Sequence, residues 1–200
     1  MLTAQDLYSL EQYSANRSAF KSRAVEHRKL RQVKLGENMT LHFEDRVTVQ
    51  YQIQEMLLIE RTFNQQGIQD ELDAYNPLIP TSTNLKATLT IEYSNPDVRS
   101  QKLEELHGVE DQIYLKVEGH QPVYAVADED MDRSTDTKTA AVHFLRFELT
   151  PEMIADLRDS NTAFSVGSDH SLYNHYTRVN NSTKEMLVKD FSEQPKLVLS

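Results

Sequence analysis

The hydrophobic pattern of this chain changes its period after Pro80, and that change limits the fold class. Before Pro80, apolar residues recur mostly at the three- and four-residue spacing of helices, most clearly over residues 43–63. After it, apolar and polar residues alternate, as they do from Leu85 to Tyr93, which is typical of an antiparallel strand with one buried face. Helices followed by alternating strands predict an α+β fold.

The predicted architecture has N-terminal helices and a central buried helix packed on the apolar face of a mainly antiparallel sheet of about five to six strands. A length of 200 residues suits a single domain over residues 1–200. We expect a mainly helical part over 1–80, a mainly antiparallel sheet over 81–176 and a C-terminal helix over 182–191. The most apolar strand candidate, residues 140–149, is predicted to be central in the sheet.

Residues 43–63 form the predicted central helix, whose apolar side chains fall on two faces. One face holds Val49, Ile53, Met56, Leu57 and Phe63, and the other holds Val47, Tyr51 and Leu58. A helix that is apolar on two sides is expected to be covered on two sides.

Ionisable and amide side chains share this helix. Glu60 falls within the first apolar face, Glu55 lies beside the second, and a polar seam is formed by Gln50, Gln54 and Arg61. A buried carboxylate without a partner costs several kcal/mol. We therefore expect Glu55 and Glu60 to meet partners from elsewhere in the chain, which points to a site without naming its chemistry.

The net charge of −10 and a sequence pI near 5.1 make the protein acidic. Its overall field repels phosphate backbones and anionic lipids, so we expect no nucleic acid and no membrane as partners. The basic segment before Gly36, which includes Arg28 and Arg31, is predicted to be a solvated helix face. The absence of cysteine, of a signal-peptide pattern and of a long apolar run predicts a cytoplasmic location.

The sequence has no Gly-rich phosphate loop, HExxH or GxSxG motif, so any site has to be assembled from scattered side chains. The predicted pocket residues are Glu55, Glu60, Arg61, Tyr75, Asn76, Glu92, Arg146 and Tyr173. The sequence does not identify a cofactor, although carboxylates and neutral imidazole suit a divalent metal such as zinc, iron or manganese. The predicted metal ligands are Glu55, Glu60, His143 and His170.

Structural roles remain open for the same residues. His143 shares its strand face with Leu145 and Phe147, as does a core histidine that donates to a neighbouring carboxylate or carbonyl. Arg146 would then form a buried ion pair with Glu60 or Glu92.

The segment Gly167-Ser168-Asp169-His170 is predicted to be a loop. There, His170 is either a ligand or a surface residue beside a turn that Asp169 caps.

A series of phrases in the chain carries a resemblance to a known family. They are LHFEDRVTVQYQIQEML, IERTF, ELDAYNPLIP, LKATLTIEY, GVEDQIYLKV, ADED, AVHFLRFELT and GSDHSLY. In this order they make the chain similar to an uncharacterised bacterial family, domain of unknown function 3501. Members stand in gene neighbourhoods beside rubrerythrin-like and iron–sulfur oxidoreductase proteins. The resemblance therefore implies a redox or iron-related setting, and it carries over no catalytic residue.

Three hypotheses for function follow. The first is a non-catalytic accessory or binding protein of a bacterial redox or iron-related system, with rubrerythrin-like or iron–sulfur redox proteins as partners. The second is a metal-binding protein or an enzyme with a carboxylate and histidine site, in which Arg146 orients an anionic substrate. In the third, the polar seam of the central helix serves a homodimer interface. The sequence does not decide whether the protein is an enzyme.

Overall fold

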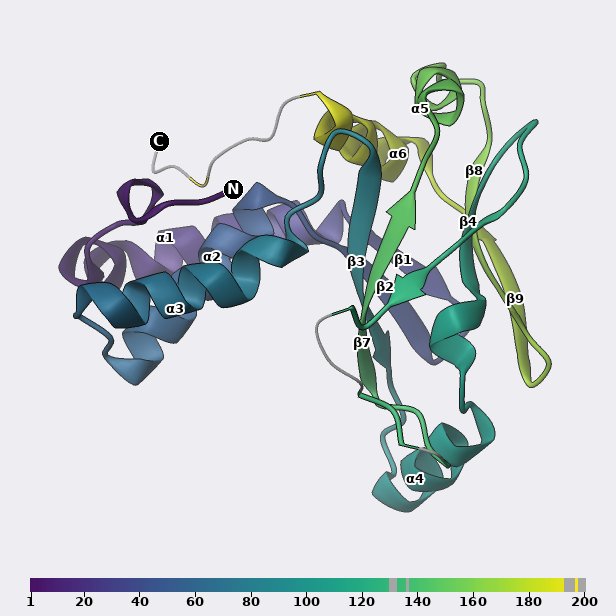
Figure 1. Ribbon diagram of the computed structural model, residues 1–200, viewed down its shortest axis with the longest axis horizontal. Coiled ribbons are helices and arrows are strands. Elements are labelled where there is room, and N and C mark those ends of the chain that lie inside the picture. Colours follow the sequence, from purple (N-terminus) through teal and green to yellow (C-terminus); the bar gives the residue numbers. More distant parts are fainter. Residues whose placement is uncertain (130–132, 136, 193–196, 198–200) are drawn as a thin grey trace.

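The computed structural model describes residues 1–129, 133–135, 137–192 and 197. It has an α+β fold in which a layer of helices lies beside two antiparallel sheets (Figure 1), and this confirms the predicted fold class. The helical layer consists of α1 (Leu10–Lys29), α2 (Arg46–Glu60) and α3 (Gln65–Tyr75), with the short 3-10 turns η1 (Ala4–Asp6) and η2 (Asn76–Leu78) at its ends.

The strands form two sheets rather than the one that was expected. Sheet A has the order β1-β2-β3-β7-β6, and sheet B has the order β5-β4-β8-β9. The strands of sheet A are β1 (Gln32–Leu35), β2 (Met39–Phe43), β3 (Asn84–Ile91), β7 (Val142–Glu148) and β6 (Val126–Ala127). Those of sheet B are β5 (Val123–Tyr124), β4 (Ile113–Val117), β8 (Phe164–His170) and β9 (Tyr173–Arg178).

Three details of the sheets differ from the sequence-based expectation. The strand β3 is central in sheet A, and β7 lies between β3 and the two-residue strand β6. The segment 123–127 divides between the two sheets, because β5 pairs with β4 whereas β6 pairs with β7. The residues Gly167 to His170 continue β8 instead of forming a loop, and β9 pairs along its whole length with residues 165–170.

The apolar faces of the two sheets pack against each other and form the main core. Alternation places Leu85, Leu89 and Ile91 of β3 in one cluster with Ile113 and Leu115 of β4. The prediction that the central helix covers the apolar face of the sheet is therefore wrong. Sheet B covers that face. The end of β8 and all of β9 were not expected as strands, because residues 167–178 carry too many polar side chains to resemble a buried strand.

The helix α2 is the predicted central helix, and its neighbours are other helices. Asp45 caps its N-terminus by accepting a hydrogen bond from the backbone N–H of Thr48 at 2.9 Å. One apolar face packs with Leu72 of α3, in a cluster that includes Val49, Ile53 and Leu57. The other face packs with α1, in a cluster that includes Tyr13, Phe20 and Val47. The expectation of a helix covered on two sides is confirmed.

The end of α2 corrects the prediction for Glu60. The helix ends at Glu60, where Arg61 adopts a left-handed backbone conformation with φ of 54° and donates its N–H to the last turn. Glu60 and Arg61 are exposed, and Phe63 is 67% exposed beyond the helix end. Glu60 therefore lies in water at the tip of the helical layer and needs no buried partner.

The amide seam of α2 binds the ends of the chain. The side chain of Gln50 donates to the backbone carbonyl of Asp6 at 2.7 Å and accepts from the backbone N–H of Leu197 at 3.0 Å. Gln54 accepts from the backbone N–H of Tyr8 at 2.6 Å. Both amides are buried, so the hydrogen-bonding groups of Gln50 and Gln54 are occupied by contacts within the chain.

The remaining helices close the ends of the sheets. They are α4 (Pro96–Glu105), α5 (Pro151–Leu157) and α6 (Asn181–Val188), with the 3-10 turns η3 (Val109–Gln112) and η4 (Lys189–Phe191). The helix α6 and the turn η4 match the predicted C-terminal helix. The two prolines of residues 76–80 predict an extended crossing, whereas residues 76–78 form η2. The acidic, polar run of residues 128–136 predicts a surface loop, and this segment lies partly outside the described residues. No helix of the described part of the chain is both long enough and apolar enough to cross a bilayer.

Candidate functional site

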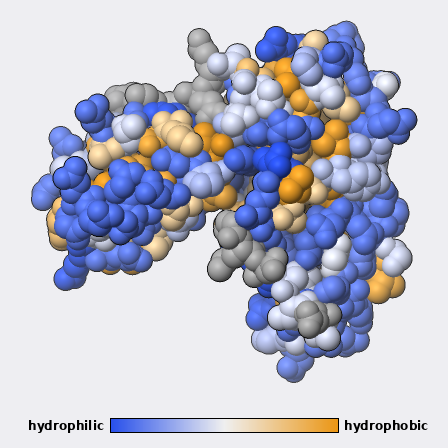
Figure 2. All heavy atoms as spheres, in the orientation of Figure 1, coloured by the Kyte–Doolittle hydropathy of each residue, from blue (hydrophilic) through white to orange (hydrophobic). Residues whose placement is uncertain are grey.

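A cleft lies between the helical layer and the outer face of sheet A. Two adjoining hollows of about 290 and 310 Å³ form it, and both are lined by Glu44, Gln52 and Phe144. In the space-filling view, a notch separates the helical mass from the mass of the sheets (Figure 2). The cleft is the place where the two parts of the molecule present side chains to the same space.

The sheet side of the cleft follows from strand alternation. Inward side chains of β2, β3 and β7 fill the core, so the side chains between them point outward. Register then sets them in rows: His42 pairs with Thr88, Thr88 pairs with Phe144, and Lys86 pairs with Arg146. Five polar or aromatic side chains from three strands thus face the helices.

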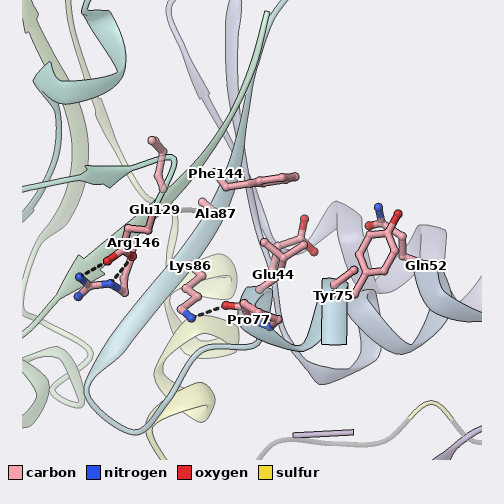
Figure 3. A pocket seen from close by; sticks show the side chains of 12 residues that line it. Glu44, Gln52, Tyr75, Pro77, Lys86, Ala87, Glu129, Phe144 and Arg146 are labelled. Atoms are coloured by element: carbon pink, nitrogen blue, oxygen red, sulfur yellow. Dashed lines mark hydrogen bonds and ion pairs between the residues drawn. The ribbon is translucent and has the colours of Figure 1, made fainter. Parts of the chain in front are cut away.

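The helical side contributes Gln52 of α2 and Tyr75 at the end of α3. In the close-up view these two side chains lie together opposite Phe144, and Glu44 lies between them and Lys86 (Figure 3). Pro77 and Leu78 of η2 line the same hollow. The result is a recess with one aromatic side chain from each wall and a carboxylate between them, the mix of apolar walls and few polar groups that small-molecule sites use.

Glu44 is the most buried carboxylate of the cleft wall, with 7% of its surface exposed, and the guanidinium of Arg31, which is 1% exposed, lines the second hollow beside it. One carboxylate oxygen accepts a hydrogen bond from the hydroxyl of Thr48 at 2.5 Å, and the other accepts from the hydroxyl of Thr88 at 2.7 Å. The two threonines come from α2 and β3, so the carboxylate is held from both walls. Its position is therefore fixed by the packing of the two layers.

The basic groups of the cleft have partners of their own. Arg146 donates to Glu129 at 2.7 and 2.8 Å and to Glu148 at 2.8 Å. Lys86 donates to the backbone carbonyl of Pro77, and burial lowers the pKa of its ammonium group. Burial likewise lowers the pKa of His42, whose ring lies 3.3 Å from the hydroxyl of Thr90.

Two of the predicted pocket residues, Tyr75 and Arg146, line this cleft. The others have separate positions. Glu55 accepts hydrogen bonds from Tyr13 at 2.8 Å and from Arg17 at 2.7 Å on the α1 side of α2, and Arg17 lowers the pKa of its carboxyl. The partner expected for Glu55 thus exists, although it comes from α1 and not from the sheet.

Asn76, Tyr173 and Glu92 also lie apart from one another. The side chain of Asn76 binds the backbone of Leu2, accepting at 2.7 Å and donating at 3.0 Å. The hydroxyl of Tyr173 donates to the carbonyl of Leu35 at 2.7 Å. Glu92 is exposed just beyond β3. Each of these side chains has a structural position of its own and adds nothing to the cleft.

The structure does not bring the four predicted metal ligands together. Glu55 and Glu60 lie on α2, His143 lies on β7 and His170 ends β8, in the other sheet. Within the described ranges, no group of three or more histidine, aspartate or glutamate side chains could hold a metal ion. His170 is buried, and its Nδ1 accepts a hydrogen bond from the backbone N–H of Leu172 at 3.3 Å, so it belongs to the turn between β8 and β9.

His143 is the core histidine that its strand face predicted. Its side chain is fully buried, its Nδ1 lies 2.6 Å from a carboxylate oxygen of Asp128 and its Nε2 lies 3.0 Å from the carbonyl oxygen of Ala140. Both ring nitrogens are therefore used by contacts within the protein. Arg146 points to the opposite face of the strand and pairs with Glu129 and Glu148, so the expected pairing with Glu60 or Glu92 is wrong.

A second buried ionic cluster was missed in the sequence. Arg31 is 1% exposed, pairs with Asp190 of η4 and lies 3.4 Å from Asp45. His27 lies 2.6 Å from the same Asp45. The basic segment around Arg31 was expected to be solvated, and this is wrong for Arg31, because α1 ends at Lys29 and the chain then turns inward. The acids that meet it are distant in sequence, so spacing gave no signal.

The cleft residues Glu44, Gln52, Lys86 and Phe144 were also missed. The alternation of residues 39–44 and 85–93 did place Glu44 and Lys86 on outward faces. The alternation indicates which side chains point away from the core. It does not say which layer they meet.

Comparison with known proteins identifies the family. A search of curated proteins finds no match. Among solved structures, the chain is similar to a novel protein of unknown function from Burkholderia pseudomallei K96243, with 46% sequence identity, a TM-score of 0.90 and coverage of 96% of this chain and 99% of that one. The model of a family described as "Protein of unknown function (DUF3501)" matches residues 1–191. The chain therefore belongs to the DUF3501 family.

Proposed function

We propose that this protein is a non-catalytic binding protein and that the cleft between its helical layer and sheet A holds a small organic molecule. The observation that carries the proposal is the pair of adjoining hollows of about 290 and 310 Å³ that share Glu44, Gln52 and Phe144. Single hollows of this size are at the lower end of known ligand pockets, and two that adjoin suit a compact ligand.

The construction of the walls supports binding over catalysis. Glu44 is held by two threonine hydroxyls, and Arg146 by Glu129 and Glu148, so the charged groups are fixed in place. Tyr75 and Phe144 supply aromatic surface from opposite walls. Fixed polar groups between aromatic walls orient a ligand without requiring that any group transfer a proton.

A substitution that fills the cleft tests this function. Ala74 is exposed on α3 and lines the first hollow, so Ala74→Trp should occupy the space without disturbing the core. The purified protein is mixed with a small-molecule extract of bacterial cells, separated from unbound compounds and analysed by native mass spectrometry. We expect the unchanged protein to retain a compound that Ala74→Trp does not retain.

Asp73→Trp is the matched control, because Asp73 is exposed on the same helix and does not line the hollow. It should retain the compound as the unchanged protein does. Equal retention by all three proteins would place the compound outside the cleft, and no retention by any of them would remove the proposed function.

We further propose that the protein serves a redox or iron-related system, with rubrerythrin-like or iron–sulfur proteins as partners. The family membership supports this setting, through the gene neighbourhoods that the resemblance implies. The test is sedimentation velocity of this protein mixed with a purified rubrerythrin-like protein from the same cell. A complex that forms at micromolar concentration supports the partnership, and independent sedimentation of the two proteins contradicts it.

A further inference from the structure

Glu44 is a buried carboxylate that forms no direct ion pair among the described residues. It is 7% exposed, and its two oxygens accept hydrogen bonds from the neutral hydroxyls of Thr48 and Thr88. In the part of the chain that the structure describes, no arginine, lysine or histidine lies within ion-pairing distance of this carboxylate. A buried carboxylate without a cation is costly, so such groups are rare in proteins.

The basic side chains near Glu44 are committed to other partners. The buried guanidinium of Arg31 donates to the backbone carbonyl of Glu44 at 3.1 Å, and its charge faces Asp190 and Asp45. Arg28 lies over the ring of Tyr51 at 5.5 Å.

The other basic groups of the cleft are used in the same way. Lys86 is bound to the carbonyl of Pro77, Arg146 is paired with Glu129 and Glu148, and burial lowers the pKa of His42, which disfavours its charged form. Glu44 acts with Asp190 and Asp45 to raise the pKa of Arg31, but no basic side chain of the described residues forms an ion pair with its carboxylate.

The carboxylate still has acceptor capacity toward the cleft. An ionised carboxylate offers about four lone-pair positions, and the two threonine hydroxyls use two of them. Glu44 lines both hollows, so the remaining positions lie where a ligand can reach. A group with two parallel N–H donors would bind both oxygens at once, as an arginine side chain does.

The neighbours of Glu44 indicate the shape of such a group. Phe144 and Tyr75 lie on opposite walls of the recess that contains the carboxylate (Figure 3). The ring of Phe144 already has the guanidinium of Arg133 over it at 4.4 Å, so this aromatic side chain accepts a flat cation in the native structure. Flat aromatic walls and a forked acceptor suit a planar, positively charged nitrogen group.

We propose that Glu44 is the recognition site for a flat organic cation, of the amidinium or guanidinium class, that binds in the cleft beside Phe144 and Tyr75. This assignment rests on the proposed function of the cleft and deepens it by naming the chemical class of the ligand. It differs from metal binding, because a single carboxylate with two hydroxyls offers too few charged ligands for a dedicated divalent site.

Benzamidine is the probe that tests this assignment, because it joins an amidinium group to an aromatic ring. Its neutral control is benzamide, which has nearly the same shape. We expect isothermal titration calorimetry on the full chain to show benzamidine binding roughly tenfold or more tightly than benzamide, because a charge-assisted hydrogen bond is stronger than a neutral one. Equal affinity of the two probes, or no binding of benzamidine at millimolar concentration, would overturn the assignment without any variant being made.

The Glu44→Gln variant then locates the effect. It should lose the preference for benzamidine while keeping its binding of benzamide, and Glu92→Gln, an exposed change of the same kind, should keep the preference. If Glu44→Gln binds benzamidine as the unchanged protein does, the recognition site is elsewhere and the inference is wrong. A retained cellular compound that is neutral or anionic would also overturn it, while leaving the proposed function of the cleft intact.

Discussion

Asp190 lies inside the protein against Arg31 and near Asp45, and burial raises the pKa of its carboxyl to about 6. Because the folded pKa is above the ordinary value of 3.8, the native state holds this proton more tightly than the unfolded chain. The resulting stabilisation is fully present below the ordinary value and is lost as the pH rises through about 6.

The Asp190→Asn variant should lack this pH dependence of stability, since asparagine does not titrate. We expect the free energy of unfolding of the unchanged protein, relative to that of Asp190→Asn, to fall by about 2 kcal/mol between pH 4 and pH 6. Urea unfolding of both proteins across this range gives the difference. A difference that rises with pH over the same interval would mean that Arg31 sets the titration of Asp190 more strongly than burial does.

The two glutamates of α2 should respond very differently to the same substitution. Glu55→Gln weakens the hydrogen bonds from Tyr13 and Arg17, and we expect it to lower the free energy of unfolding by about 1 kcal/mol. Glu60→Gln is the control, because Glu60 is exposed at the helix end and should change stability by less than about 0.5 kcal/mol. Urea unfolding at pH 7 distinguishes them, and equal costs would contradict the positions assigned to the two side chains.

At the scale of the element, the turn between β1 and β2 has to accommodate Tyr173 of β9. Gly36 has a φ of 66°, and a Cβ added there would meet the hydroxyl of Tyr173 at 2.6 Å. That hydroxyl donates to the carbonyl of Leu35 and accepts from the N–H of Asn38 at 3.0 Å, so it fastens the turn of sheet A to the edge of sheet B. The turn therefore depends on glycine for both backbone conformation and space.

The Gly36→Ala variant should lose roughly 2 kcal/mol of unfolding free energy, from backbone strain and from the contact with Tyr173. In a Tyr173→Phe background the same change should cost less, because the hydroxyl is gone, while the backbone strain and the contact with the ring of His175 at 3.0 Å remain. Thermal and urea unfolding of the four proteins measure this coupling. Additive effects would show that the hydroxyl does not limit the space at Gly36.

At the scale of the whole molecule, the helical layer and the two sheets have separate apolar cores. Leu57 belongs to a cluster with Leu72 and Ile79, and the core between the sheets contains none of these residues. The buried cluster of Arg31, Asp45 and Asp190 connects the layers through the junctions of α1 with β1 and of β2 with α2, and through η4. The cleft lies beside this connection, so its width depends on how firmly the layers are held together.

Leu57→Ala should therefore destabilise the helical layer more than the two sheets. We expect the substitution to cost about 2–5 kcal/mol locally and to speed amide hydrogen exchange in α2 and α3 much more than in β3 and β7. Exchange measured by mass spectrometry resolves these segments. Equal acceleration in all four would show that the chain opens as one cooperative unit.

The sequence by itself determined the α+β class, the capped helix with two apolar faces, and most helices and strands. These follow from local periodicity and capping, which depend on neighbouring residues. Only the tertiary structure decided that a second sheet covers the first, that Glu60 lies in water, and that Glu44, Gln52 and Phe144 meet across one cleft. Alternation indicates which side chains of a strand point away from the core. The packing of segments that are distant in sequence decides which residues those side chains contact, and residue spacing carries no information about such contacts.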